Sequence, residues 1–271
     1  MTFMEKLEAI WRKNDSMVCV GLDPDRAKLP DCLKNSKHPI FDFNRALVDA
    51  TAPYVCAYKP QAAYYAGQDA DDELAMTIRY IRENHPEIPV ILDVKRGDIG
   101  STAEQYAKEA FMRYGADAAT VNPYMGSDAV NPFLKYSDKG VVILCRTSNP
   151  SSKELQELVA DGRKLYEHVA ILARDVWNAA GNVLLVLGAT YPGELAAVRT
   201  LCPKLPFLVP GVGAQGGDVE KVVRCGRTAD GFGLVINSSR GIIYASKEKD
   251  FAEKAALAAQ TLRDQIRAAG R

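Results

Sequence analysis

The sequence predicts an α/β protein built as a closed barrel of eight parallel strands that alternate with helices. Eight short apolar, β-branched runs recur along the 271 residues. Each run is followed by a polar or Gly/Pro turn and then by a helical pattern. Because the runs are apolar almost throughout, we expect strands covered on both faces of a parallel sheet. Eight such units in a chain of this length indicate a (β/α)8 barrel, the TIM-barrel architecture.

The predicted elements follow one another in order along the chain. The strands span residues 17–23, 54–59, 88–95, 117–122, 140–148, 182–190, 206–211 and 231–239. Helical patterns fill the intervals; in residues 101–115, Ser101 is suited to cap a helix and Gly115 to end it. The amphipathic segment 247–269 predicts a closing helix. The loops after the first and fifth strands are long, which suits active-site insertions. No low-complexity linker interrupts the pattern, so we expect a single domain over residues 1–271.

The composition restricts the partners and the compartment. The 34 basic residues balance 34 acidic ones, which argues against a general affinity for nucleic acid or for an anionic membrane. The N-terminal stretch does not resemble a signal peptide, and no run reaches the roughly 18 apolar residues of a membrane span. The six cysteines are scattered, and no histidine lies at metal-ligand spacing. We therefore expect a reduced, cytoplasmic protein without a structural metal.

Polar and charged residues gather where the predicted strands end. In a barrel of this kind the active site lies at the carboxyl ends of the strands. Those positions hold Asp23, Lys59, Asp93, Lys95, Asn122, Ser148, Thr190, the segment PGVGAQGG, Ser239 and Arg240. A rim that served solubility alone would not end apolar strands in Asp, Lys and Asp-Val-Lys. Taken alone, Asp23 and Lys59 fit a turn residue and a surface lysine as well as a functional role.

The segment DVKRGDIGST, residues 93–102, carries the densest charge. Side chains two apart on a strand share one face, so Asp93 and Lys95 should point to the same region. Asp98 follows across a turn at Gly97. A lysine between two carboxylates keeps its proton, because negative charge favours the ammonium form, and it is then a well-placed proton donor. The alternative is a surface salt-bridge cluster at the start of a helix.

Two later segments fit a phosphate site. In such barrels, backbone amides from the loops after strands seven and eight commonly hold a phosphate. Residues 206–218, PFLVPGVGAQGGD, supply the first loop; residues 237–241, NSSRG, supply hydroxyls and a guanidinium. Gly211, Gly213 and Gly216 also satisfy the dinucleotide-binding pattern G-x-G-x-x-G, but on the seventh unit instead of the first. A tight structural turn is a third interpretation.

Together these motifs resemble the orotidine 5'-phosphate decarboxylase family. DVKRGDIGST fits its pattern D-x-K-x-x-D-I-x-x-T, PGVGAQGGD fits its phosphate-closing loop, and the resemblance runs from VGLDP to the final strand. It implies a (β/α)8 barrel that works as a homodimer without metal or organic cofactor. The reaction implied converts orotidine 5'-phosphate to uridine 5'-phosphate and carbon dioxide, the last step of pyrimidine nucleotide synthesis. Segments near 24–42 and 149–170 are similar to the longer bacterial branch.

The resemblance also implies roles for single residues. Lys95 would protonate C6 of the pyrimidine, and Asp93 would lie beside the substrate's carboxylate. Asp23 and Lys59 would hydrogen-bond the ribose hydroxyls, with Lys59 also joining the charge network. Ser148 would contact the pyrimidine, Gln215 would bridge base and phosphate, and Arg240 would bind phosphate next to Ser239 of the hydroxyl-rich turn. Three residues would reach into the neighbouring subunit's site: Asp98, Ile99 and Thr102.

Three other functions share part of the pattern. Magnesium-dependent sugar-phosphate decarboxylases and aldolases share the barrel and the D-x-K-x-x-D spacing. They need an acidic metal ligand after the second strand, where this chain has Lys59-Pro60-Gln61. A nicotinamide-dependent oxidoreductase would use the glycine-rich loop. A non-catalytic phosphosugar-binding barrel is disfavoured by the lysine between two carboxylates.

Overall fold

Eight parallel strands form the centre of the molecule. The computed structural model describes residues 1–212 and 218–270. Its main sheet has the order β2-β1-β10-β9-β8-β5-β4-β3, and parallel bridges from Tyr58 to Val90 and from Gln61 to Asp93 join its two edges. The strands are β1 Val18–Leu22, β2 Ala57–Pro60, β3 Ile91–Arg96, β4 Ala118–Val121, β5 Gly140–Arg146, β8 Val183–Leu187, β9 Phe207–Pro210 and β10 Leu234–Ser238. The predicted (β/α)8 barrel is confirmed.

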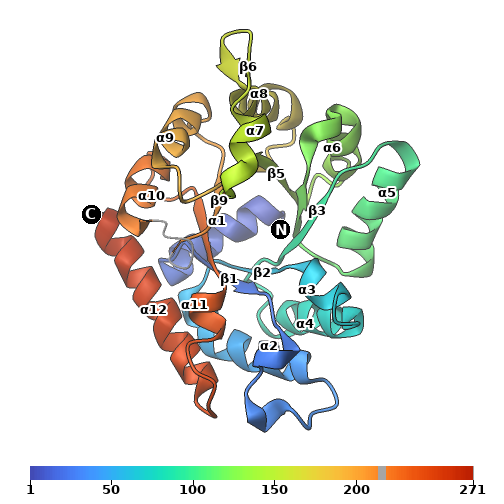
Figure 1. Ribbon diagram of the computed structural model, residues 1–271, viewed down its shortest axis with the longest axis vertical. Helices are drawn as coiled ribbons and strands as arrows, with labels where there is room; N and C mark the ends of the chain where they lie inside the picture. Colours follow the sequence, from blue (N-terminus) through green and yellow to red (C-terminus); the bar gives the residue numbers. More distant parts are fainter. Residues whose placement is uncertain (213–217, 271) are drawn as a thin grey trace.

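Helices surround the strands (Figure 1). They are α1 Phe3–Asn14, α2 Pro39–Thr51, α3 Ala62–Ala66, α4 Asp71–Asn84, α5 Gly100–Lys108, α6 Ser127–Leu134, α7 Lys153–Gln156, α8 Leu165–Leu172, α9 Pro192–Leu201, α10 Val219–Gly226, α11 Arg240–Ile243 and α12 Phe251–Gly270. Five-residue π-helical segments continue α5 and α8, over Glu109–Arg113 and Ala173–Trp177. The helix α12 confirms the predicted closing helix.

One predicted helix start is wrong. Ser101 was expected to cap the helix after the third strand, but α5 begins at Gly100 and its N-cap residue is Ile99. The cap lies two residues earlier than predicted, and the first helical residue, Gly100, has a positive φ of 54°, which a glycine takes without strain. The predicted end is confirmed, since Gly115 follows the π-helical segment with a φ of 69°.

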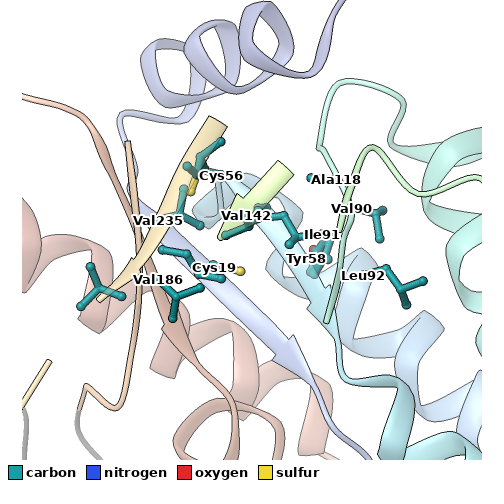
Figure 2. Packing of buried hydrophobic residues seen from close by; sticks show 14 of the residues in the cluster. Cys19, Cys56, Tyr58, Val90, Ile91, Leu92, Ala118, Val142, Val186 and Val235 are labelled. Carbon is teal, nitrogen blue, oxygen red and sulfur yellow. The ribbon is translucent and has the colours of Figure 1, made fainter. Parts of the chain in front are cut away.

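The barrel interior is filled with apolar side chains. Figure 2 shows Cys19, Val142, Val186 and Val235, which come from β1, β5, β8 and β10 and lie close together. All four belong to one cluster of buried residues that extends through the molecule. Burial of this kind is the main stabilising contribution to such a fold. The strands are therefore held rigidly, and their carboxyl ends can present polar groups in fixed positions.

The two ends of the barrel are built differently. At the amino-terminal end, α1 lies across the strands: the Phe3 amide donates to the Asp138 carbonyl, and Lys6 pairs with Asp117. At the carboxyl end lie the long loops. The loop after β1 contains two short 3-10 turns, Arg26–Lys28 and Asp31–Leu33. The loop after β5 contains α7 and the hairpin of β6 Val159–Ala160 with β7 Arg163–Lys164, which projects outward in Figure 1.

No helix within the described ranges combines the length and the apolar character that crossing a bilayer would require.

Candidate active site

A cluster of charged side chains lies where β2, β3 and β4 end. Asp93 stands at its centre: its Oδ2 accepts a hydrogen bond from Lys59 Nζ at 2.8 Å and its Oδ1 accepts one from Lys95 Nζ at 2.6 Å. The Thr120 hydroxyl also donates to Asp93 Oδ1, at 2.9 Å. One carboxylate therefore receives hydrogen bonds from two ammonium groups and a hydroxyl, which come from three neighbouring strands.

Burial and charge fix the ionisation of this cluster. Asp93 and Lys59 are buried, 5% and 4% exposed. Burial alone would favour the neutral acid, but the ammonium groups of Lys59 and Lys95 outweigh it and hold the pKa of Asp93 well below its usual range. Burial likewise opposes the charge of Lys59, but Asp93 and Asp23 raise its pKa well above the usual value. Both groups therefore stay charged at neutral pH.

Lys95 reaches the cluster by an unexpected route. The prediction that Asp93 and Lys95 meet is confirmed, but simple strand alternation does not produce the contact. Lys95 has a positive φ of 46°, and the pairing of β3 with β4 shifts register between Leu92 and Arg96. This β-bulge redirects the chain at the rim, as bulges beside active sites commonly do. The Lys95 side chain is 44% exposed, so a ligand at the carboxyl end of the strands can reach it.

The second predicted carboxylate does not join the cluster. Asp98 was expected to flank Lys95, but in the described part of the chain Lys95 forms an ion pair with Asp93 alone. Asp98 Oδ1 instead accepts the backbone amide of Ile99 at 2.8 Å. Within one subunit Asp98 therefore does not flank Lys95, and its predicted contact with the neighbouring subunit's site stays a prediction. Ile99 and Thr102 are exposed.

Asp23 lies at the end of β1, beside the strand that carries Lys59. Register pairs Gly21 of β1 with Lys59 of β2. One oxygen of Asp23, Oδ1, is buried and has no hydrogen-bond partner among the described residues. A buried acceptor without a partner is costly, so a ligand hydroxyl placed there would gain a hydrogen bond. The two predicted ribose contacts, Asp23 and Lys59, are therefore brought together.

Ser239 and Arg240 lie at the end of β10, the next strand around the barrel from β1. Ser239 Oγ accepts from Asn237 Nδ2 at 3.4 Å. Arg240 begins α11, its side chain is exposed, and it has no ion-pair partner in the described ranges. The neighbouring strand β9 ends before Gly211, which has a φ of 96°. The predicted loop residues Gly213, Gln215 and Gly216 lie outside the described residues.

Ser148 follows β5 in a loop held by a buried arginine. The Arg146 side chain is 1% exposed, and its Nη2 donates to Glu157 Oε1 at 2.6 Å. The Thr147 hydroxyl is engaged by Gln156 at 2.8 Å. Gln156 Oε1 also accepts the Thr147 backbone amide at 2.9 Å. The side chain of Thr147 is thereby committed to the loop itself.

Sequence reasoning missed Thr120, Gly21, Gly188 and Arg146. Gly21 and Gly188 could have been found from the sequence, because a glycine at the end of an apolar strand often marks a close approach of another segment. A Cβ on Gly21 would lie 1.8 Å from Ser239 Oγ, and one on Gly188 would lie 2.8 Å from the backbone of Ser148. Both glycines thus make room for predicted site residues.

The fold and the rim together define a class of protein. The cluster of Lys59, Asp93 and Lys95 lies a few strands around the barrel from the turn that carries Ser239 and Arg240. Both lie at the end of the barrel where enzymes of this fold place their active sites. Across residues 1–212 and 218–270, no group of three or more His, Cys, Asp or Glu side chains is arranged to hold a metal ion. The molecule is a (β/α)8-barrel enzyme whose rim suits a small anionic substrate.

Comparison with known proteins identifies the family. The profile of the orotidine 5'-phosphate decarboxylase / HUMPS family matches residues 16–255, and the chain belongs to this family. It is 59% identical over 266 residues to the orotidine 5'-phosphate decarboxylases of Ralstonia pickettii and Dechloromonas aromatica, with 98% of each chain covered. The solved structure of Leishmania donovani OMP decarboxylase matches with a TM-score of 0.87 and 40% identity, over 100% of this chain and 99% of that one.

Proposed function

We propose that this enzyme decarboxylates orotidine 5'-phosphate to uridine 5'-phosphate, in pyrimidine nucleotide synthesis, with Lys95 as the acid that protonates C6. The 59% sequence identity to orotidine 5'-phosphate decarboxylases, over 98% of the chain, supports the reaction. The position of Lys95 supports its role. Of the two ammonium groups on Asp93, that of Lys59 is buried and that of Lys95 is at the open end, 44% exposed, where a substrate can reach it.

The proposed reaction breaks one bond and forms another. The bond between C6 and the substrate's carboxyl group breaks, carbon dioxide leaves, and the electron pair remains on C6. The Lys95 ammonium, placed where this negative charge develops, stabilises it and transfers a proton to C6. Lys95 then recovers a proton from solvent. Throughout, the buried ammonium of Lys59 keeps Asp93 charged and in place.

Asp93 would lie against the carboxylate that leaves. Two negative groups side by side repel each other, and this repulsion ends as carbon dioxide departs. Binding of the rest of the nucleotide would hold the substrate in this arrangement. We assign the ribose to Asp23 and Lys59, the base to Ser148 and Gln215, and the phosphate to Gln215, Ser239 and Arg240.

We also propose a homodimer that shares its sites. Apolar side chains are exposed near the turns after β3 and β4: Ile99 at 53%, Tyr124 at 75% and Met125 at 50%. The two turns are in contact, because a Cβ on Gly97 would lie 3.0 Å from the Asn122 carbonyl oxygen. An exposed apolar patch of this kind suits a protein partner. A second copy docked there would bring Asp98, Ile99 and Thr102 to the partner's rim.

The reaction and the role of Lys95 can be tested with one variant. Lys95→Ala should lower turnover of orotidine 5'-phosphate by at least about 10⁴-fold and change uridine 5'-phosphate affinity by less than about threefold, since it removes both the acid and the cation. Turnover is followed by pyrimidine absorbance. Retained turnover would refute the role of Lys95. No turnover by the wild-type enzyme would refute the reaction.

Mixing two inactive variants tests the shared site. Asp98→Ala should also be inactive if Asp98 completes the partner's site. When it is mixed with Lys95→Ala by co-expression, half of the dimers contain one intact site. About a quarter of wild-type activity should then return. If Asp98 acts within its own subunit, the mixture stays inactive.

A metal-dependent sugar-phosphate enzyme is the alternative, because such enzymes share the barrel and the D-x-K-x-x-D spacing of residues 93–98. At the end of β2, where such an enzyme needs an acidic ligand, this chain has the ammonium of Lys59, 2.8 Å from Asp93. This ammonium favours the decarboxylase. Turnover measured with and without a chelator separates the two, since only the metal-dependent reaction would stop.

A cytoplasmic location is also part of this proposal. All six cysteines are free thiols, and Cys19, Cys56, Cys145 and Cys202 are buried. Proteins of oxidising compartments more often pair such residues in disulfides. Free thiols and a nucleotide substrate both fit the cytoplasm.

A further inference from the structure

Thr120 occupies the centre of the bulge that carries Lys95. It lies on β4 and is 1% exposed. Leu92 pairs with Ala119 and Arg96 with Val121, so three residues of β3, Asp93 to Lys95, face Thr120 alone. The regular ladder of backbone hydrogen bonds is interrupted over these three residues. Their amides must find other partners, because buried backbone donors are seldom left unpaired.

The Thr120 hydroxyl supplies a partner for two of these three amides. Its oxygen accepts the backbone amides of Val94 and Lys95, each at 2.9 Å, and the hydroxyl donates to Asp93 Oδ1, also at 2.9 Å. A hydroxyl has one proton to donate and two lone pairs to accept with, so its capacity is fully used. The directions are fixed, because backbone amides can only donate and an ionised carboxylate can only accept.

We propose that Thr120 is a positioning residue for the decarboxylation, a proposal that rests on the function assigned above. Lys95 has a positive φ of 46°, which is uncommon for a residue with a side chain. Its backbone is held there by the bond from its own amide to Thr120. The same oxygen orients Asp93, the carboxylate that pairs with the Lys95 ammonium. Thr120 thus fixes both ends of the Lys95 side chain, the backbone and the charged group, without touching substrate.

A comparison of Ser with Ala at this position isolates the hydroxyl. Thr120→Ser keeps the oxygen and loses a methyl group, whereas Thr120→Ala differs from it by that oxygen alone. We expect Thr120→Ala to lower kcat about 100-fold, because displacement of a reacting group by about 1 Å costs a factor of this size. KM and uridine 5'-phosphate affinity should change less than about threefold, since Thr120 contacts no substrate. Thr120→Ser should stay within about threefold of wild type.

A buried threonine away from the site provides the matched control. Thr51 is fully buried on α2 and donates to the Leu47 carbonyl at 2.7 Å. Thr51→Ala should lower the melting temperature without lowering kcat. Three results would each overturn the proposal: Thr120→Ala with kcat within twofold of wild type, Thr120→Ser as impaired as Thr120→Ala, or a loss that appears in KM instead of kcat.

Hydrogen exchange tests the same bonds in the wild-type enzyme, whether or not Thr120→Ala folds. The amides of Val94 and Lys95 should exchange slowly in wild type and in Thr120→Ser. Exchange at the rate of an exposed loop in the wild-type enzyme would overturn the proposal. This measurement does not depend on turnover, so it remains decisive if the wild-type enzyme fails to act on orotidine 5'-phosphate.

Discussion

The two ends of the barrel each join lysine to aspartate, but they do so in different ways. At the amino-terminal end, Lys6 Nζ lies 3.0 Å from Asp117 Oδ2, one cation against one anion. The same oxygen accepts the Val90 amide at 2.8 Å, so the carboxylate also satisfies the backbone. At the carboxyl end, Asp93 faces two ammonium groups, Lys59 and Lys95. The first arrangement neutralises charge, and the second leaves a surplus cation at the mouth of the barrel.

Backbone geometry shows the same contrast. Near Asp117 the strands are in regular register, with Ala118 opposite Gly140 and the following pairs in step. Near Asp93 the register shifts, and Lys95 adopts a positive φ. A strained backbone conformation persists only where the surrounding contacts hold it in place, and such positions tend to be functional. One end of the barrel is therefore built for stability, and the other holds a reactive group in an unfavourable conformation.

Replacing each aspartate by asparagine should separate the two ends most clearly. Asp93→Asn removes the carboxylate that both ammonium groups share; we expect turnover to fall by at least about 10²-fold and stability by about 3 kcal/mol. Asp117→Asn keeps an oxygen that can accept the Val90 amide. This variant should lose about 1 kcal/mol of folding stability and keep its turnover within about twofold of wild type. Turnover assays and denaturant titrations measure both effects. Equal losses of turnover would contradict the contrast.

Two glycines provide a second, smaller test. A Cβ on Gly21 would lie 1.8 Å from Ser239 Oγ, at the rim, and a Cβ on Gly140 would lie 2.4 Å from the Phe3 ring, under α1. Gly21→Ala should displace Ser239 and raise KM for orotidine 5'-phosphate about tenfold, which corresponds to about 1.4 kcal/mol of binding. Gly140→Ala should instead cost about 1–3 kcal/mol of stability by overpacking. Steady-state kinetics and thermal unfolding measure the two. A KM change in Gly140→Ala without a change in melting temperature would contradict this division.

The sequence predicted the fold and most of the rim because both depend on local patterns. Apolar runs define the strands, and polar residues at their ends identify Asp23, Lys59, Asp93 and Lys95 as rim positions. Once the barrel closes, these strand ends must meet. The contact of Asp93 with Lys95 was predicted correctly from alternation, although a bulge brings it about.

The rest depends on contacts between segments that are far apart in the chain. Thr120 is 27 residues from Asp93 and binds it only because β4 pairs with β3 in a shifted register. A buried threonine within an apolar run gives no sign of such a role. Asp98 does not pair with Lys95 within one chain, and its predicted contact with a neighbouring subunit's site depends on a second copy that spacing in one sequence does not place. Periodicity shows which face a residue occupies, but not where the register shifts.

The smallest expected effect is a dependence of stability on pH. The two ammonium groups hold the pKa of Asp93 below its usual range in the folded protein. Asp93 therefore stabilises the fold fully above the unfolded pKa of about 3.9, and this contribution is lost as pH falls further, because the unfolded chain then binds a proton that the folded protein does not. The stability difference between wild type and Asp93→Asn should be constant from about pH 5 to 8 and shrink by about 1 kcal/mol by pH 3. Denaturant titrations across this range measure it. A difference that grows with acid would mean that folded Asp93 takes up a proton more readily than the unfolded chain, and that the ion pairs at the rim do not control its charge.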